Sequence, residues 1–96
     1  MTDKRKEYEE KFAAQLKEWS AEIARLKVQA EKAGAEVKSE LFKTLATLQD
    51  ERSLARRKLR ELRSAGDEAW KDARAGAESV WSEIKALLRN AASRFK

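Results

Sequence analysis

The sequence predicts an all-α protein, and three observations lead to this fold class. Charged residues make up 41% of the 96 residues and apolar residues 42%, with no proline and only three glycines. This composition is typical of long helices, because sheets with tight turns need more turn-forming residues. Apolar residues recur at helical spacing, and one segment carries a complete helix-stop and helix-start signal. Because a chain of this length forms one domain at most, we expect residues 1–96 to be a single helical domain.

The first expected element is a helix over about residues 3–64, because its apolar residues keep one helical face. They are spaced by about 3.6 residues on average, and the phase is unbroken at Gly34. Gly34 lies among helix formers in KAGAEV, and one interior glycine costs only about 1 kcal/mol relative to alanine. A continuous helix is therefore favoured, and a turn at Gly34 is the alternative.

The segment RSAGDEAW at 63–70 predicts the end of this helix. Gly66 suits the left-handed conformation that ends many helices, and Asp67 suits the cap of the next one. We therefore expect a turn at 65–67 and a return helix over about 67–95. The expected hairpin core between the two helices consists of Leu59, Leu62, Trp70, Val80, Trp81, Ile84, Leu88 and Phe95.

The unequal lengths of these helices predict self-association. The first would be about 90 Å long and the second about 45 Å, so a row of apolar residues from Tyr8 to Ile23 would stay bare. Soluble monomers rarely expose such a row. We therefore expect an antiparallel coiled-coil homodimer with a three-helix cross-section. Its expected dimerisation core consists of Tyr8, Phe12, Leu16, Trp19, Ile23, Leu26, Gly34, Val37, Leu41, Leu45 and Leu48.

The alternative is a monomeric three-helix bundle. If the chain turns at Gly34, the two halves of the first helix pair within one chain in the register that the dimer would use between chains. The two arrangements are domain-swapped relatives of each other.

The basic run at 52–63 is the strongest candidate for a ligand surface. It holds six positive charges against Glu61 alone, and it has no aromatic residue on which a base could stack. One interpretation is that it pairs with Glu7, Glu9 and Glu10, which fall opposite it in the expected register. The alternative is contact with nucleic acid or anionic membrane. The candidate polyanion contacts are Arg56, Arg57, Lys58, Arg60 and Arg63.

Two further residue types have structural interpretations. Arg52 lies on the apolar face of the first expected helix, at a position where leucine would be expected. We therefore expect Arg52 to select the helix register, and to pair with Glu83 or stack on Trp81. The three tryptophans lie on the apolar stripes, which favours core anchors over a ligand pocket.

The composition argues against an enzyme. The chain has neither histidine nor cysteine, which removes the commonest general base, the commonest transition-metal ligands and the thiol nucleophile. It has no phosphate-cradling glycine loop, so we expect no cofactor, no metal and no small-molecule substrate. It also has no secretory signal and no apolar run of about 18 residues, so we expect a cytoplasmic protein that does not span a membrane.

The blocks YEEKFAAQLKEWSAEIARLKVQAEKA and AWKDARAGAESVWSEIKALLRNAASRF carry a family resemblance. With them the chain resembles a group of small, largely uncharacterised bacterial coiled-coil proteins that are sometimes described as stress-induced. The resemblance covers most of the chain, with 34–62 matching less distinctly. It implies a helical, oligomeric bacterial protein with no enzyme activity to carry over. The expected function is therefore that of a non-enzymatic coiled-coil assembly or interaction protein, with a relation to stress implied by the resemblance alone. The alternative is a basic helical module that binds nucleic acid or anionic membrane through 52–63.

Overall fold

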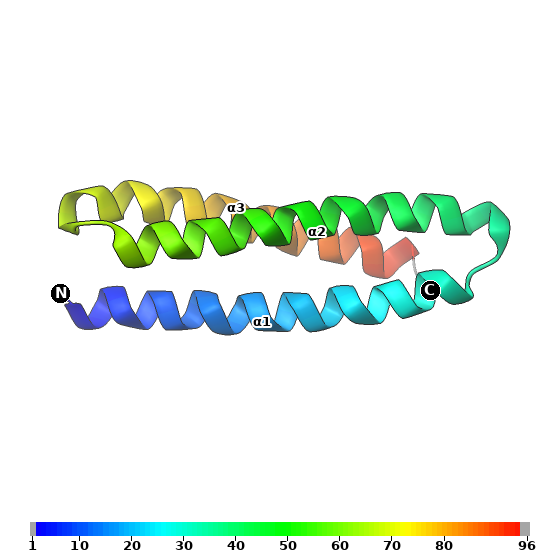
Figure 1. The fold of residues 1–96 in the computed structure, drawn as a ribbon, viewed down its shortest axis with the longest axis horizontal. Helices are drawn as coiled ribbons and strands as arrows, with labels where there is room; N and C mark the ends of the chain where they lie inside the picture. The colour runs from blue at the N-terminus through cyan, green and yellow to red at the C-terminus, as the bar shows by residue number, and fades with distance from the viewer. Residues whose placement is uncertain (1, 95–96) are drawn as a thin grey trace.

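The computed structural model describes residues 2–94 as a bundle of three helices. They are α1 (Thr2–Lys32), α2 (Ala35–Ser64) and α3 (Asp67–Arg94). The described residues contain no strand, so the all-α prediction is confirmed. Figure 1 shows α2 running back along α1, and α3 reversing again to lie in the same direction as α1. The bundle measures 51 × 18 × 17 Å.

The helix expected over about 3–64 is not continuous. It is divided into α1 and α2 by Ala33 and Gly34, where the chain reverses. Gly34 precedes α2 in an extended conformation, with φ −66° and ψ 157°, and its carbonyl accepts from the N–H groups of Val37 and Lys38 at 3.1 and 2.9 Å. The expectation of one long helix is therefore wrong.

The unbroken helical spacing of the apolar residues did not distinguish a continuous helix from a turn at Gly34. In the structure α1 and α2 direct their stripes into the same core, so a two-residue turn leaves the apparent period unchanged. The last buried residue before the turn is Ala30, and the first after it is Leu41. Both Gly34 and Val37 were expected in the core. Val37 is instead 50% exposed, and Gly34 is also exposed.

The second reversal lies between Ser64 and Asp67, at the position of the predicted helix boundary. Its local chemistry differs from the expectation. Gly66 does not have a positive φ, so the left-handed conformation expected there is absent, and Ala65 ends α2 in an extended conformation. The Asp67 carboxylate accepts a hydrogen bond from the side chain of Arg5 at 3.5 Å.

A first core cluster fills the end of the bundle where α1 begins and α2 ends. It is centred on aromatic rings: Trp81 of α3 packs edge to face against Phe12 and Trp19 of α1, at 5.4 and 5.7 Å between ring centroids. The rings hold α1 and α3 together through their side chains, while α2 closes the third side. The buried residues of this cluster are Phe12, Leu16, Trp19, Ala55, Leu59, Leu62, Ala77, Val80 and Ile84.

A second core cluster lies toward the α1–α2 turn. Its buried residues are Ile23, Ala30, Leu41, Leu45, Leu48 and Ala91. Leu26 and Leu88 are partly buried against it, as Tyr8, Trp70 and Trp81 are against the first cluster, whereas Phe95 lies outside the described residues. The apolar row of α1 is thus covered by α2 and α3 of the same chain. The bare row from which a dimer was expected does not exist in this arrangement.

Candidate functional site

The candidate site is the outward face of the last three turns of α2. Arg56, Arg57, Arg60 and Arg63 are all exposed, and we call these four residues the arginine face. Arg56, Arg60 and Arg63 follow an i, i+4, i+7 pattern, so they lie in one row along the helix, with Arg57 beside them. Ala55, Leu59 and Leu62 of the same turns are buried in the bundle core. Amphipathic packing of α2 therefore presents the four guanidinium groups to solvent.

The acidic N-terminal turns do not neutralise the arginine face. Glu7 forms an ion pair with Lys11 at 3.8 Å, and Glu9 forms one with Arg5 at 3.1 Å, both within α1. Glu9 also accepts a hydrogen bond from the Trp70 indole at 3.1 Å. Among the described side chains, no carboxylate lies within ion-pair distance of the arginine face. The interpretation of the basic run as the partner of Glu7, Glu9 and Glu10 is therefore wrong.

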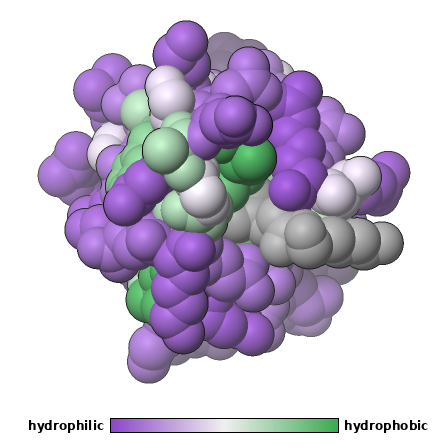
Figure 2. All heavy atoms as spheres, turned by 90° about the vertical axis from the view of Figure 1, so that its right-hand side faces the viewer, coloured by the Kyte–Doolittle hydropathy of each residue, from purple (hydrophilic) through white to green (hydrophobic). Residues whose placement is uncertain are grey.

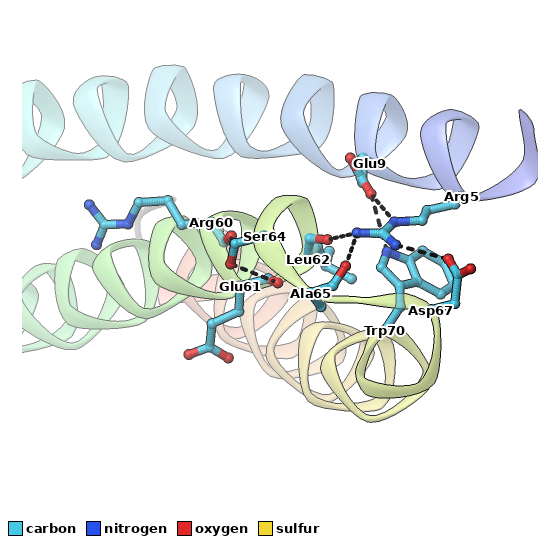
Figure 3. A network of polar contacts seen from close by, with 9 residues as sticks. All are labelled: Arg5, Glu9, Arg60, Glu61, Leu62, Ser64, Ala65, Asp67 and Trp70. Atoms are coloured by element: carbon cyan, nitrogen blue, oxygen red, sulfur yellow. Dashed lines mark hydrogen bonds and ion pairs between the residues drawn. The ribbon is translucent and has the colours of Figure 1, made fainter. Parts of the chain in front are cut away.

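Arg5 engages Glu9 and also joins α1 to the end of α2. Its guanidinium crosses from α1 to the end of α2, where it donates to the carbonyl of Leu62 at 2.8 Å and to that of Ala65 (Figure 3). The last carbonyls of a helix have no partner within the helix, so they attract a cation. The same guanidinium reaches the carboxylates of Glu9 and Asp67. Arg5 thereby connects the ends of all three helices.

Lys58 is separated from the arginine face. Its ammonium group pairs with Glu61 at 3.4 Å, and its side chain is only 27% exposed. It lies over Gly76 of α3, where an added Cβ would meet the Lys58 Nζ at 3.5 Å. Lys58 therefore covers the contact between α2 and α3, and its assignment as a polyanion contact is corrected.

Glu51 of α2 lies close to Glu83 of α3 farther along the bundle. Burial raises the pKa of Glu51, and a hydrogen bond with Glu83 and the negative charges of Glu83 and Asp50 raise this pKa further. One Glu51 oxygen and the Nε of the adjacent Arg52 are buried without a hydrogen-bond partner among the described residues. Neither of the contacts expected for Arg52, with Glu83 or with Trp81, is present there.

Sequence reasoning missed Arg5 and Arg74, although both had a recognisable signal. Arg5 precedes Glu9 by one helical turn, and Arg74 follows Trp70 by one turn and precedes Glu78 by another. In the structure Arg74 lies over the rings of Tyr8 and Trp70, at 5.0 and 5.8 Å from their centroids. These spacings indicate local pairs, but nothing in them shows that α1 and α3 lie side by side.

The structure adds two findings on other classes of site. Within residues 2–94, no group of three or more acidic side chains is placed to hold a metal ion. None of the three described helices has an apolar stretch long enough to cross a membrane. Comparison of the chain with protein-family models, with curated proteins and with solved structures finds no match.

Proposed function

We propose that the protein is a non-enzymatic interaction module that binds the phosphate backbone of a nucleic acid through the arginine face. The observation that carries this proposal is the set of four exposed arginines on one side of α2, with no acidic partner among the described side chains. Unpaired guanidinium groups need not give up an internal ion pair to bind an external anion. The arginine face is therefore available to a ligand in the folded bundle.

The chemistry and spacing of the arginine face fit phosphate groups. Arginine presents a planar fork of N–H donors that matches two phosphate oxygens, and it keeps its charge at every physiological pH. Along the helix axis, Arg60 and Arg63 lie about 6 and 10 Å from Arg56. The same turns of α2 are anchored in the bundle by the buried Ala55 and Leu62. A row of fixed cations suits a polymer of regularly repeated negative charges.

A nucleic acid fits this surface better than a membrane does. Helices that bind a membrane surface insert an apolar face beside their basic residues. The apolar residues of α2 are buried in the bundle core, and the residues that flank the arginines on the exposed side are polar, among them Ser53 and Ser64. Membrane binding would therefore require the bundle to open, whereas phosphate binding would not.

The test is a fluorescence anisotropy titration of a labelled DNA duplex. Wild-type affinity should fall steeply between about 50 and 200 mM salt, because each phosphate contact contributes about 0.9 to the slope of log affinity against log salt. Replacing Arg56, Arg60 and Arg63 by glutamine should reduce that slope by about 2.7. The matched control replaces Arg25, Arg89 and Arg94 by glutamine, which removes the same charge from exposed positions elsewhere.

Three results would contradict the proposal. The first is no duplex binding at about 50 mM salt. The second is an equal loss of duplex affinity in both triple variants, because binding would then depend on net charge and not on the arginine face. The third is binding to anionic vesicles without binding to the duplex, which would favour the membrane.

A second candidate function is assembly of two copies, favoured by apolar side chains around the α1–α2 turn. Val28, Val37 and Phe42 are the exposed large hydrophobic residues of the described chain, and all three flank this turn. Figure 2 views this end of the bundle and shows apolar residues gathered within a mostly hydrophilic surface. Straightening at Gly34 would exchange α1 between two copies and bring these segments together.

A cysteine at Gly34 tests the exchange directly, because the chain has no other cysteine. In an exchanged dimer, the two copies of residue 34 would meet on the two-fold axis, so Gly34→Cys should form an intermolecular disulfide rapidly under mild oxidation. The control is Ser39→Cys, at an exposed position one turn into α2. Equally slow cross-linking of both variants would contradict the exchange.

A further inference from the structure

A groove between the first turns of α1 and the first turns of α3 has the features of a second binding site. Its volume is about 1070 Å³, which is large enough for a small organic molecule. It lies on the α1–α3 side of the bundle, away from the arginine face. The residues that define its chemistry are Lys4, Tyr8 and Lys11 of α1, and Trp70, Lys71 and Arg74 of α3.

The groove contains two aromatic rings in edge-to-face contact and a guanidinium group over them. The rings of Tyr8 and Trp70 meet edge to face, 5.8 Å apart and at 84°. Arg74 lies over the Tyr8 ring, and its side chain is 51% exposed. One side of its guanidinium therefore covers the aromatic pair, while the group remains accessible from the groove. A flat ligand ring could stack on the accessible side of this guanidinium, because guanidinium groups stack on aromatic faces.

The charges of the groove leave two cations unpaired. Its lining includes three carboxylates, and each already has a basic partner: Glu7 pairs with Lys11, Asp67 with Arg5, and Glu78 with Arg74. Lys4 and Lys71 have no ion pair with any described side chain. Lys4 belongs to the first turn of α1, where the helix dipole also favours a negatively charged ligand, and Lys71 follows the first turn of α3. The remaining affinity of the groove is thus for an anion.

We propose that this groove binds a small aromatic anion of the nucleoside monophosphate class. The ring of the ligand stacks on the Arg74 guanidinium beside Tyr8 and Trp70, and the phosphate is held by Lys4 and Lys71. This site goes beyond the proposed function, because it uses different helices and different residues from the arginine face. The two proposals can therefore fail independently.

The test is a titration of the isotope-labelled protein with adenosine monophosphate, followed by NMR. The indole N–H of Trp70 donates to Glu9 beside the groove, so its resonance reports binding at this site. We expect it to shift with a dissociation constant in the millimolar range or below, and to shift much less with inorganic phosphate or adenosine alone. Replacing both Lys4 and Lys71 by glutamine should weaken binding at least about tenfold.

Two control variants separate this site from general charge effects. Replacing Lys27 and Lys43 by glutamine removes the same charge from exposed positions outside the groove, and replacing Arg56 and Arg60 removes it from the arginine face. Both should bind adenosine monophosphate as the wild type does. Circular dichroism and melting temperature establish that each variant is folded.

The proposal would be overturned by any of three results. One is the absence of a Trp70 shift up to about 10 mM adenosine monophosphate. Another is an equal response to inorganic phosphate, which would indicate an adventitious ion only. The third is an equal loss of affinity in the Lys27 and Lys43 variant, since binding would then follow net charge.

Discussion

At the scale of single residues, the side chain of Arg5 connects the three helices by hydrogen bonds and ion pairs. Its side chain is 20% exposed and contacts two backbone carbonyls and two carboxylates. Hydrogen bonds from a charged donor are worth about 1.5–3 kcal/mol each when partly shielded from water. We expect Arg5→Ala to lower the free energy of unfolding by about 2–3 kcal/mol, measured by urea denaturation.

The neighbouring Lys6 provides the control for this prediction, because it is exposed and forms no ion pair with a described side chain. Lys6→Ala should change stability by less than about 0.5 kcal/mol. Arg5→Lys should recover only part of the loss, because an ammonium group cannot span the same four acceptors. An Arg5→Ala variant as stable as Lys6→Ala would contradict this role.

The carboxyl pair of Glu51 and Glu83 predicts a pH dependence of stability. Burial, followed by the hydrogen bond and charge of Glu83, raises the pKa of Glu51 in the folded state above the ordinary value of 4.5. The folded state therefore binds a proton more tightly than the unfolded state does. This contribution to stability is fully present below pH 4.5 and is lost as the pH rises through the folded pKa.

Replacing Glu51 by glutamine should remove this dependence. We expect Glu51→Gln to be more stable than the wild type at pH 7, because the amide carries no buried charge, and to lose that advantage below about pH 4.5. Urea denaturation at both pH values measures the difference. The exposed Glu40→Gln variant is the control. An advantage of Glu51→Gln that is the same at both pH values would contradict the assignment.

At the scale of helices, periodicity predicted the helical class and most of the buried positions, but it could not locate the first turn. Phe12, Leu16, Trp19 and Ile23 are buried as the stripe predicts. The stripe reports only which side of a helix is apolar, and the same side faces the core whether the partner helix comes from the same chain or from a second one. The basic run was recognisable in the sequence, whereas the pairing of Glu7 with Lys11 and of Glu9 with Arg5, which takes these carboxylates away from it, was not predicted.

The turn itself makes a testable prediction, because Gly34 has no conformational need for glycine. Its φ is negative, and an added Cβ would meet nothing within 4 Å. It also precedes α2 without a side-chain cap. Gly34→Asp should supply that cap and be about 1 kcal/mol more stable than Gly34→Ala. In a continuous helix the order would be reversed, because alanine is the best helix former, so urea denaturation of both variants decides between the two arrangements.

At the scale of the whole molecule, three helices in one chain bury the row that a longer helix would leave bare. The unequal helix lengths expected from the sequence made a second copy necessary, whereas helices of 31, 30 and 28 residues cover one another. The acidic first turns of α1 and the basic run at 52–63 then lie within one bundle, but their described side chains form no ion pairs with each other. The central claim is therefore that a compact single chain presents an unneutralised arginine face.

The most direct test of this claim combines light scattering with small-angle X-ray scattering on the wild-type chain in moderate salt. A compact bundle predicts a mass of 11.0 kDa and a radius of gyration close to 15.4 Å. A mass of about 22 kDa with a particle about 90 Å long would contradict it, because that length requires α1 and α2 to join into one continuous helix.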